Sequence, residues 1–306
     1  MIYLLKFWEK IEPVKMVNKG IWFLLPAYLM WGLSPVFWKT LGHVSPLELV
    51  LHRTIWSFLL LIIIVILQGR MGEIKSIFQQ KKVLRSLFLT MLILGSNWFV
   101  FIWAVNNNQI LQTSLGYYIN PLFFIFLGMV FLKERLRKLQ LIALIFASVG
   151  VIYFSVSIGS FPWIALLLAV SFGIYGLVHK KIAVESLPGL CVETMLLSIP
   201  VSVYLLWQGF NGEGAFLNID FKTDFLLVGT CIFTAFPLLF FTSGARRTTF
   251  STVGFMQYIA PSSSFLLAIF LYKEPLSFEK LFTFVMIWIA LLFYTIDLVK
   301  HHKANT

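Results

Sequence analysis

The chain consists of long apolar stretches separated by short polar segments. Each stretch contains about 20 residues, and a helix of that length crosses the hydrocarbon core of a bilayer, which is about 30 Å thick. Runs such as residues 59–67 (LLLIIIVIL) do not alternate apolar and polar side chains, so they predict transmembrane helices rather than strands of a β-barrel. We expect ten such helices, at about residues 21–38, 48–67, 86–105, 114–132, 139–157, 162–178, 189–208, 224–243, 252–271 and 281–299.

The composition agrees with this pattern. Hydrophobic residues make up 59% of the chain, charged residues only 12%, and the mean hydropathy is +0.88. An average soluble domain contains about 25% charged residues. A soluble fold of this length needs more polar surface than this chain supplies, so we predict an all-α integral membrane protein.

Lysine and arginine are concentrated in alternate connections between the predicted helices. Most of the 24 basic residues lie in residues 1–19, 70–85, 133–138, 180–181, 246–247 and 300–303. Basic residues are retained on the cytoplasmic side of a membrane, so with ten spans both termini are expected in the cytoplasm. The net charge of +11 then reflects topology, and we expect no nucleic acid as a partner.

Two segments repeat the same pattern. Residues 118–136 (YINPLFFIFLGMVFLKERL) and 258–276 (YIAPSSSFLLAIFLYKEPL) match at an offset of 140 positions. At an offset of 141, Lys39 corresponds to Lys180. The repeat predicts two domains of five helices each, at residues 19–158 and 159–299, flanked by an N-terminal extension (1–18) and a cytoplasmic tail (300–306).

The number of helices in each repeat has a structural consequence. Five is odd, so equivalent helices of the two halves cross the membrane in opposite directions. Inverted repeats are a recurrent plan of secondary transporters, because two similar halves that face opposite ways supply two gates of nearly equal energy. This predicts alternating access.

An ordered set of segments carries a family resemblance. The segments are AYLMWGLSPVFWK (27–39), ELVLHRTIWS (48–57), NWFVFIWAVN (97–106), SLGYYINP (114–121), FLKERL (131–136), SFGIYGL (171–177), VET (192–194), FMQYIAP (255–261) and KEP (273–275). In these segments the chain resembles the RarD proteins of the EamA branch of the drug/metabolite transporter superfamily. The resemblance implies a ten-helix fold with two EamA repeats in the bacterial plasma (inner) membrane. It also implies a permease in a family loosely linked to chloramphenicol, without implying a substrate.

Arg53 is a charged residue inside a predicted span. Charges within spans are costly and usually face a cavity or a partner. We expect the guanidinium to bind an anionic solute or to form part of an outer gate, together with Trp56. The alternative is a structural ion pair with Glu48, or extension of the side chain to the outer surface. Glu48 and His52 are four residues apart on the same helix and are candidates for gating or proton coupling.

Glu193 lies 140 positions after Arg53, near the inner end of its span. By the inversion it belongs to the opposite gate, where a titratable carboxyl could couple a proton to transport. The alternative is a pair with Lys180 or Lys181.

Further polar residues are candidates for lining a central cavity. Proline frees a helical carbonyl and kinks its helix, and polar side chains beside it then suit a cavity wall. The alternative is hydrogen bonding between helices that only holds the bundle together. A midplane amide and indole suit recognition of a flat solute. The residues concerned are Tyr118 and Asn120 beside Pro121, Gln257 and Tyr258 beside Pro261, and Asn97 and Trp31 near the midplane.

Two Lys-Glu steps end the repeated segments at opposite surfaces. They are Lys133–Glu134 and Lys273–Glu274. We expect them to fix helix ends through local pairing, and a role in gating stays open.

Several chemistries have no sequence signal. The chain contains no phosphate-binding G-x-x-x-x-G-K-[ST], no H-E-x-x-H and no G-x-S-x-G. We therefore expect no cofactor, no metal and no catalytic residue. The function predicted is secondary transport of small metabolites or drugs by alternating access. A membrane-embedded enzyme or lipid-handling protein, and a non-transporting membrane partner, remain alternatives. The solute, the coupling ion, the direction of transport, the oligomeric state and the start site (Met1 or Met16) stay open.

Overall fold

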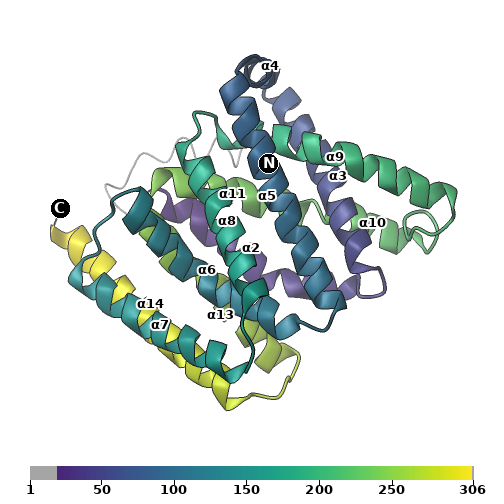
Figure 1. Cartoon of the computed structure of the whole chain (residues 1–306). Coiled ribbons are helices and arrows are strands. Elements are labelled where there is room, and N and C mark those ends of the chain that lie inside the picture. The colour runs from purple at the N-terminus through teal and green to yellow at the C-terminus, as the bar shows by residue number, and fades with distance from the viewer. Residues whose placement is uncertain (1–18, 305–306) are drawn as a thin grey trace.

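A computed structural model describes residues 19–304, which form a bundle of helices without strands (Figure 1). The N-terminal extension predicted at residues 1–18 lies outside the described residues. The helices are α2 (Ile21–Thr40), α3 (Pro46–Leu67), α4 (Met71–Gln79), α5 (Lys81–Asn106), α6 (Ile110–Phe131), α7 (Lys138–Ser157), α8 (Trp163–Lys181), α9 (Ser186–Phe210), α10 (Phe221–Gly229), α11 (Ile232–Arg247), α12 (Phe250–Gln257), α13 (Ile259–Leu266), the π-helix η1 (Leu267–Leu271) and α14 (Phe278–Ala304).

Within residues 19–304, ten helical segments are long and apolar enough to cross a membrane. They confirm the ten predicted spans, although most begin or end a few residues beyond the expected boundaries. The eighth span combines α10 and α11, and the ninth combines α12, α13 and η1. The extra helix α4 was not predicted. It turns Ile74 and Ile77 inward and leaves Glu73 at the surface, where a hydrogen bond from Arg70 lowers the pKa of the Glu73 carboxyl.

The break in the ninth span has a local cause. Proline at position 261 cannot donate to the carbonyl of Gln257, four residues earlier. The regular helix α12 ends at Gln257, and α13 begins at Ile259. The predicted kink beside Pro261 therefore appears as an interruption, whereas α6 runs without interruption through Pro121.

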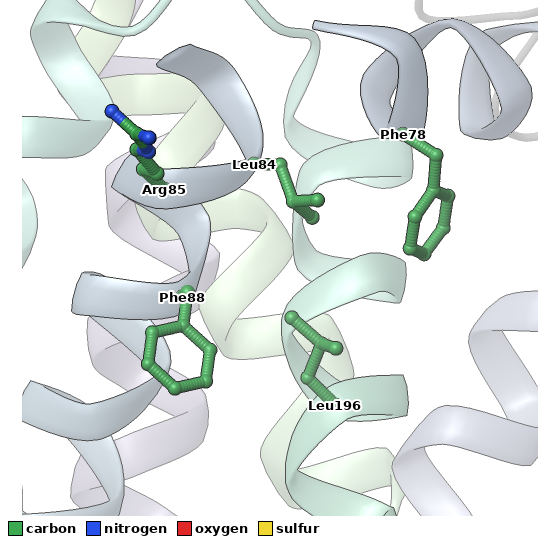
Figure 2. A pocket seen from close by; sticks show the side chains of 5 residues that line it. All are labelled: Phe78, Leu84, Arg85, Phe88 and Leu196. Carbon is green, nitrogen blue, oxygen red and sulfur yellow. The ribbon is translucent and has the colours of Figure 1, made fainter. Parts of the chain in front are cut away.

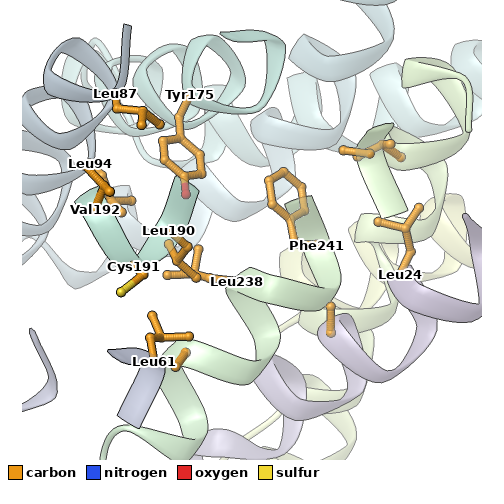
Figure 3. Packing of buried hydrophobic residues seen from close by; sticks show 14 of the residues in the cluster. Leu24, Leu61, Leu87, Leu94, Tyr175, Leu190, Cys191, Val192, Leu238 and Phe241 are labelled. Carbon is orange, nitrogen blue, oxygen red and sulfur yellow. The ribbon is translucent and has the colours of Figure 1, made fainter. Parts of the chain in front are cut away.

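The helices that surround the centre of the bundle share one apolar core. Side chains from α2, α3, α5, α8, α9 and α11 point toward one another there, with Tyr175 and Phe241 among the fully buried rings (Figure 3). A second cluster joins α6 to α7, α12 and α14, and α7 and α14 lie side by side along one edge (Figure 1). A glycine lets α2 approach α13, because a Cβ at Gly32 would lie 2.7 Å from the carbonyl oxygen of Ala260.

The two ends of the bundle differ in charge. We call the end where α3 ends and α5 begins the basic end, because it contains the connections rich in lysine and arginine. We call the other end, where α2 connects to α3, the opposite end. Here Ser45 caps α3 by accepting a hydrogen bond from the Glu48 amide at 3.2 Å, and Pro46 follows it as the first helical residue.

Candidate functional site

A cavity of about 780 Å³ lies inside the bundle, lined by residues of α2, α3, α5 and α6 and of α8, α11, α12 and α13. It reaches the opposite end, where Pro46, Val105 and Pro275 are among its lining residues, and it extends inward to Asn120 and Gln257. Pockets of about 300–1,000 Å³ that combine apolar walls with a few polar groups are typical of small-molecule sites. This cavity meets both criteria.

Arg53 projects from α3 into the cavity wall. Its Nε donates to Thr234 Oγ1 at 3.0 Å, and its guanidinium carbon lies 4.5 Å from the centre of the Trp98 ring. Across residues 19–304 no carboxylate lies within ion-pair distance of this guanidinium, and its terminal nitrogen atoms have no hydrogen-bond partner. The alternative pair with Glu48 is therefore absent, and the charge is compensated only by a hydroxyl and aromatic faces.

Two amide side chains in the cavity wall have unpartnered oxygen atoms. Asn120 and Gln257 are each only 6% exposed, and neither Asn120 Oδ1 nor Gln257 Oε1 accepts a hydrogen bond from the described residues. A buried acceptor without a partner costs about 1–3 kcal/mol. Both residues line the cavity, but the two oxygen atoms themselves are buried and remain unsatisfied in this structure. Asn97 differs, because its Nδ2 donates to Leu168 O at 3.0 Å and to Ser171 Oγ at 2.8 Å.

The aromatic candidates divide into two groups. Trp31 and Tyr118 line the cavity, and Trp31 packs against Phe172 with ring centres 5.9 Å apart. Tyr258 and Trp56 are absent from the cavity lining. Tyr258 is fully buried and donates to the carbonyl of Tyr118 at 3.2 Å, so it joins α12 to α6. Trp56 donates to His52 Nδ1 at 3.2 Å on its own helix.

Glu48 and His52 belong to a separate contact at the opposite end. Glu48 Oε1 accepts a hydrogen bond from the Ala215 amide at 2.5 Å and lies 3.6 Å from His52 Nε2. Both side chains are buried. The contact fixes the connection between α9 and α10 against the start of α3.

Glu193 lies in a polar cluster away from the cavity. Its carboxylate accepts hydrogen bonds from Thr90 Oγ1, from Tyr175 Oη at 3.3 Å and, through Oε1, contacts His179 Nε2 at 2.8 Å. Glu193 and His179 are each 2% exposed. The expected alternative, a pair with Lys180 or Lys181, is absent.

Sequence reasoning missed the partners of both charged residues. Nothing in the sequence placed Thr234 beside Arg53 or Thr90 beside Glu193, because these pairs come from helices far apart in the chain. Tyr175 lies on the helix directly before that of Glu193, and this contact was also missed. His179 was a usable signal, since a histidine near the end of an apolar span needs a partner.

Other candidate sites in the described part of the chain are weaker. No group of three or more His, Cys, Asp or Glu residues between positions 19 and 304 is arranged to hold a metal ion. A groove of about 410 Å³ lies at the basic end between α4, α5 and α9 (Figure 2). Its lining is Phe78, Leu84, Arg85, Phe88 and Leu196. This lining offers little for recognising a polar solute, so the larger cavity is the candidate site.

Comparison with known proteins places the chain in a family. The model of the EamA-like transporter family matches residues 18–156 and again residues 161–296. The chain belongs to the EamA-like transporter family. Both the resemblance noted in the sequence and the all-helical membrane fold are thereby confirmed.

Individual relatives cover nearly the whole chain. An uncharacterized transporter of Vibrio cholerae is 43% identical over 92% of this chain and 94% of its own length. The uncharacterized transporter YojE of Bacillus subtilis is also 43% identical, over 94% of this chain and 97% of its own. Protein RarD of Escherichia coli is 40% identical over 95% of this chain and 99% of its own. Two of these names and the family description name transporters, so the chain is a multi-pass membrane protein of a transporter family.

A solved structure has a similar fold. It is titled only "Crystal structure of protein", and it covers 93% of this chain and 99% of its own, with a TM-score of 0.71. At 17% sequence identity this likeness concerns the fold alone.

Proposed function

We propose that this protein is a secondary transporter that carries a small solute across the bacterial plasma membrane, with the cavity around Arg53 as its solute site. The observation that supports this most is a part-buried guanidinium without an anionic partner in a cavity of solute size. A charge inside a span is costly, and a ligand that compensates it accounts for its presence.

Alternating access is the proposed mechanism. Two matches of one family model, over five helices each, support two halves at residues 19–158 and 159–299. Because the number is odd, consecutive halves run in opposite directions, as in transporters built from inverted repeats. The cavity meets the opposite end in this structure, and the same halves rearranged would expose it at the basic end. Because basic residues are retained on the cytoplasmic side, the basic end and both termini are proposed to lie in the cytoplasm.

The chemistry of the lining points to an organic anion. A guanidinium binds carboxylates and phosphates through paired N–H donors, and the terminal nitrogen atoms of Arg53 are available for this. Trp31, Trp98 and Phe172 offer aromatic faces to the rest of the solute. Asn120 and Gln257 add amide side chains to the cavity wall. We therefore expect an anionic solute with an apolar or aromatic part.

Glu193 is the proposed proton-coupling group. It is buried with His179, Tyr175 and Thr90, and all four can change their hydrogen bonds when one proton is added. The cluster joins α5, α8 and α9, so protonation would alter contacts between the two halves of the chain.

The test is solute counterflow in proteoliposomes, with wild type and Arg53→Gln at equal incorporation. The panel contains organic acids, amino acids, nucleobases and chloramphenicol. We expect saturable exchange with an anionic class, reduced at least about tenfold in Arg53→Gln, because a hydrogen bond to a charged group contributes about 1.5–3 kcal/mol.

The matched control is Lys222→Gln, which removes an exposed cation at the same end. It should keep the wild-type rate. Arg53→Gln with wild-type exchange of the transported solute would contradict the role assigned to the cavity.

A further inference from the structure

Glu134 joins the end of α6 to the start of α12 at the basic end. Its Oε1 accepts a hydrogen bond from the Phe250 amide at 2.6 Å, and its Oε2 accepts from the Ser251 amide at 2.8 Å and the Ser251 hydroxyl at 2.6 Å. The first amides of a helix lack intrahelical acceptors, and the helix dipole favours a carboxylate beside them. Glu134 therefore fastens α12 to α6.

Close packing accompanies this carboxylate contact. A Cβ built at Gly128 would lie 3.2 Å from the Phe250 Cβ, and one built at Gly254 would lie 2.5 Å from the carbonyl oxygen of Pro121. The backbones of α6 and α12 thus approach closely, as small residues permit between membrane helices. The basic end is closed along this line.

A lysine strengthens the same closure. Lys180 Nζ donates to the Ala245 carbonyl at 2.8 Å and also to the carbonyl of Thr248, two residues before α12 begins. The cation thereby satisfies carbonyl groups at the end of α11.

The repeat places equivalent residues at the opposite end. An offset of 140 relates Glu134 to Glu274, and it relates the start of α12 at Phe250 to the start of α6 at Ile110. The local backbone is also equivalent. Lys133 has a φ of 55° and Lys273 a φ of 57°. The following amide donates to the residue six positions earlier at 3.0 Å in both cases, from Glu134 to Gly128 and from Glu274 to Ala268.

The equivalent contacts, however, are not made. Glu274 is exposed and lines the cavity, and so does Ile110. By the same offset, Gly254 corresponds to Ser114 and Gly128 corresponds to Ala268. Ser114 and Ala268 also line the cavity rather than lying at a close contact between helices. No side chain caps the start of α6, so its first amides lack the carboxylate that those of α12 have.

We propose that Glu134 and Glu274 are alternating latches. In the state shown, Glu134 caps α12 and the basic end is closed. In the other state Glu274 caps the amides of Ile110 and Leu111, the opposite end closes, and Glu134 releases α12. Lys39, the counterpart of Lys180, then donates to the carbonyls of Val105 and Asn108. This inference rests on the proposed alternating access and assigns the residues that hold each state.

The test measures the distance across each end with pairs of spin labels in lipid nanodiscs. Exposed positions close to the latches suit the labels: Arg135→Cys with Arg247→Cys at the basic end, and Asn107→Cys with Leu276→Cys at the opposite end, in a background with Cys191→Ala and Cys231→Ala. The measured quantity is the ratio of the two states in each variant, and it requires no knowledge of the solute.

Removing the charge of one latch residue should favour the state that the other latch residue stabilises. Glu134→Gln should shift the ratio about tenfold toward an open basic end and a closed opposite end, because it weakens hydrogen bonds to a charged acceptor. Adding Glu274→Gln in that background should return the ratio toward the wild-type value. Glu213→Gln, an exposed carboxylate at the opposite end, is the matched control and should leave the ratio unchanged.

The outcomes distinguish the latch proposal from the alternating-access mechanism on which it rests. If the distances at the two ends change in opposite directions but Glu274→Gln has no effect in the Glu134→Gln background, the latch proposal is overturned and alternating access stands. An unchanged ratio in Glu134→Gln also overturns the latch. Distances at the two ends that never change in opposite directions, in any variant or with any solute, overturn the proposed mechanism itself.

Discussion

Arg53 and Glu193 stand at equivalent positions of the two repeats, 140 residues apart, yet their surroundings differ sharply. The guanidinium of Arg53 faces a cavity and makes one hydrogen bond, to Thr234. The carboxylate of Glu193 is buried and surrounded by three partners from α5 and α8. The same repeat position thus holds an unpaired cation in one half and a fully satisfied anion in the other.

This difference indicates that the two matching positions have different roles. A buried charge without internal partners needs a ligand, whereas a buried charge with several hydrogen bonds contributes to the structure and responds to protonation. The comparison predicts that substitutions at Arg53 act mainly on transport and that substitutions at Glu193 act first on stability.

The largest expected effect on stability comes from Glu193→Ala. It leaves the buried polar groups of Tyr175 and His179 without their partner, and removing one partner of a buried polar network costs about 3–5 kcal/mol. Thermal unfolding in detergent should show a clear loss of stability. Glu193→Gln keeps the shape and one acceptor, so its loss should be smaller.

The control for this prediction is Thr194→Ala, the adjacent buried position, whose hydroxyl bonds only to carbonyls of its own helix. An unfolding temperature of Glu193→Ala equal to that of Thr194→Ala would remove the distinction between the two charged positions.

A smaller effect is expected from Thr234→Val. The change keeps the shape of the side chain and the Arg53 guanidinium but removes the acceptor that orients it. The half-saturating solute concentration in counterflow should rise several-fold while the protein stays folded. Thr242→Val is the matched control, because its hydroxyl bonds only within α11. Equal effects of the two valine variants would show that Thr234 does not position Arg53.

The sequence predicted the positions of the spans better than the direction of individual side chains. Span positions follow from hydrophobicity and helical rise, so the ten spans could be derived. The direction of a side chain around its helix depends on the neighbouring helices, which the sequence does not state. For this reason Tyr258 was expected in the cavity but lies between α6 and α12.

For the same reason, the sequence revealed a charged contact within one helix but not the charged contacts between helices. The four-residue spacing of Glu48 and His52 revealed a local pair, and the structure contains it. The repeat offset paired Glu134 with Glu274, but only the structure shows that one caps a helix while the other lines the cavity. The short helix α4 was missed because its nine residues are too few and too polar for a span signal.

The most direct test of the account is the sided reactivity of Asn120→Cys, a position deep in the cavity with an unpartnered oxygen. A membrane-impermeant thiol reagent is applied to right-side-out and to inverted vesicles, in the background without Cys191 and Cys231. The account predicts modification from the side of the opposite end, and faster modification from the side of the basic end when Glu134→Gln is added. No modification from either side, in folded protein, would contradict a solute cavity that opens to the two membrane faces in turn.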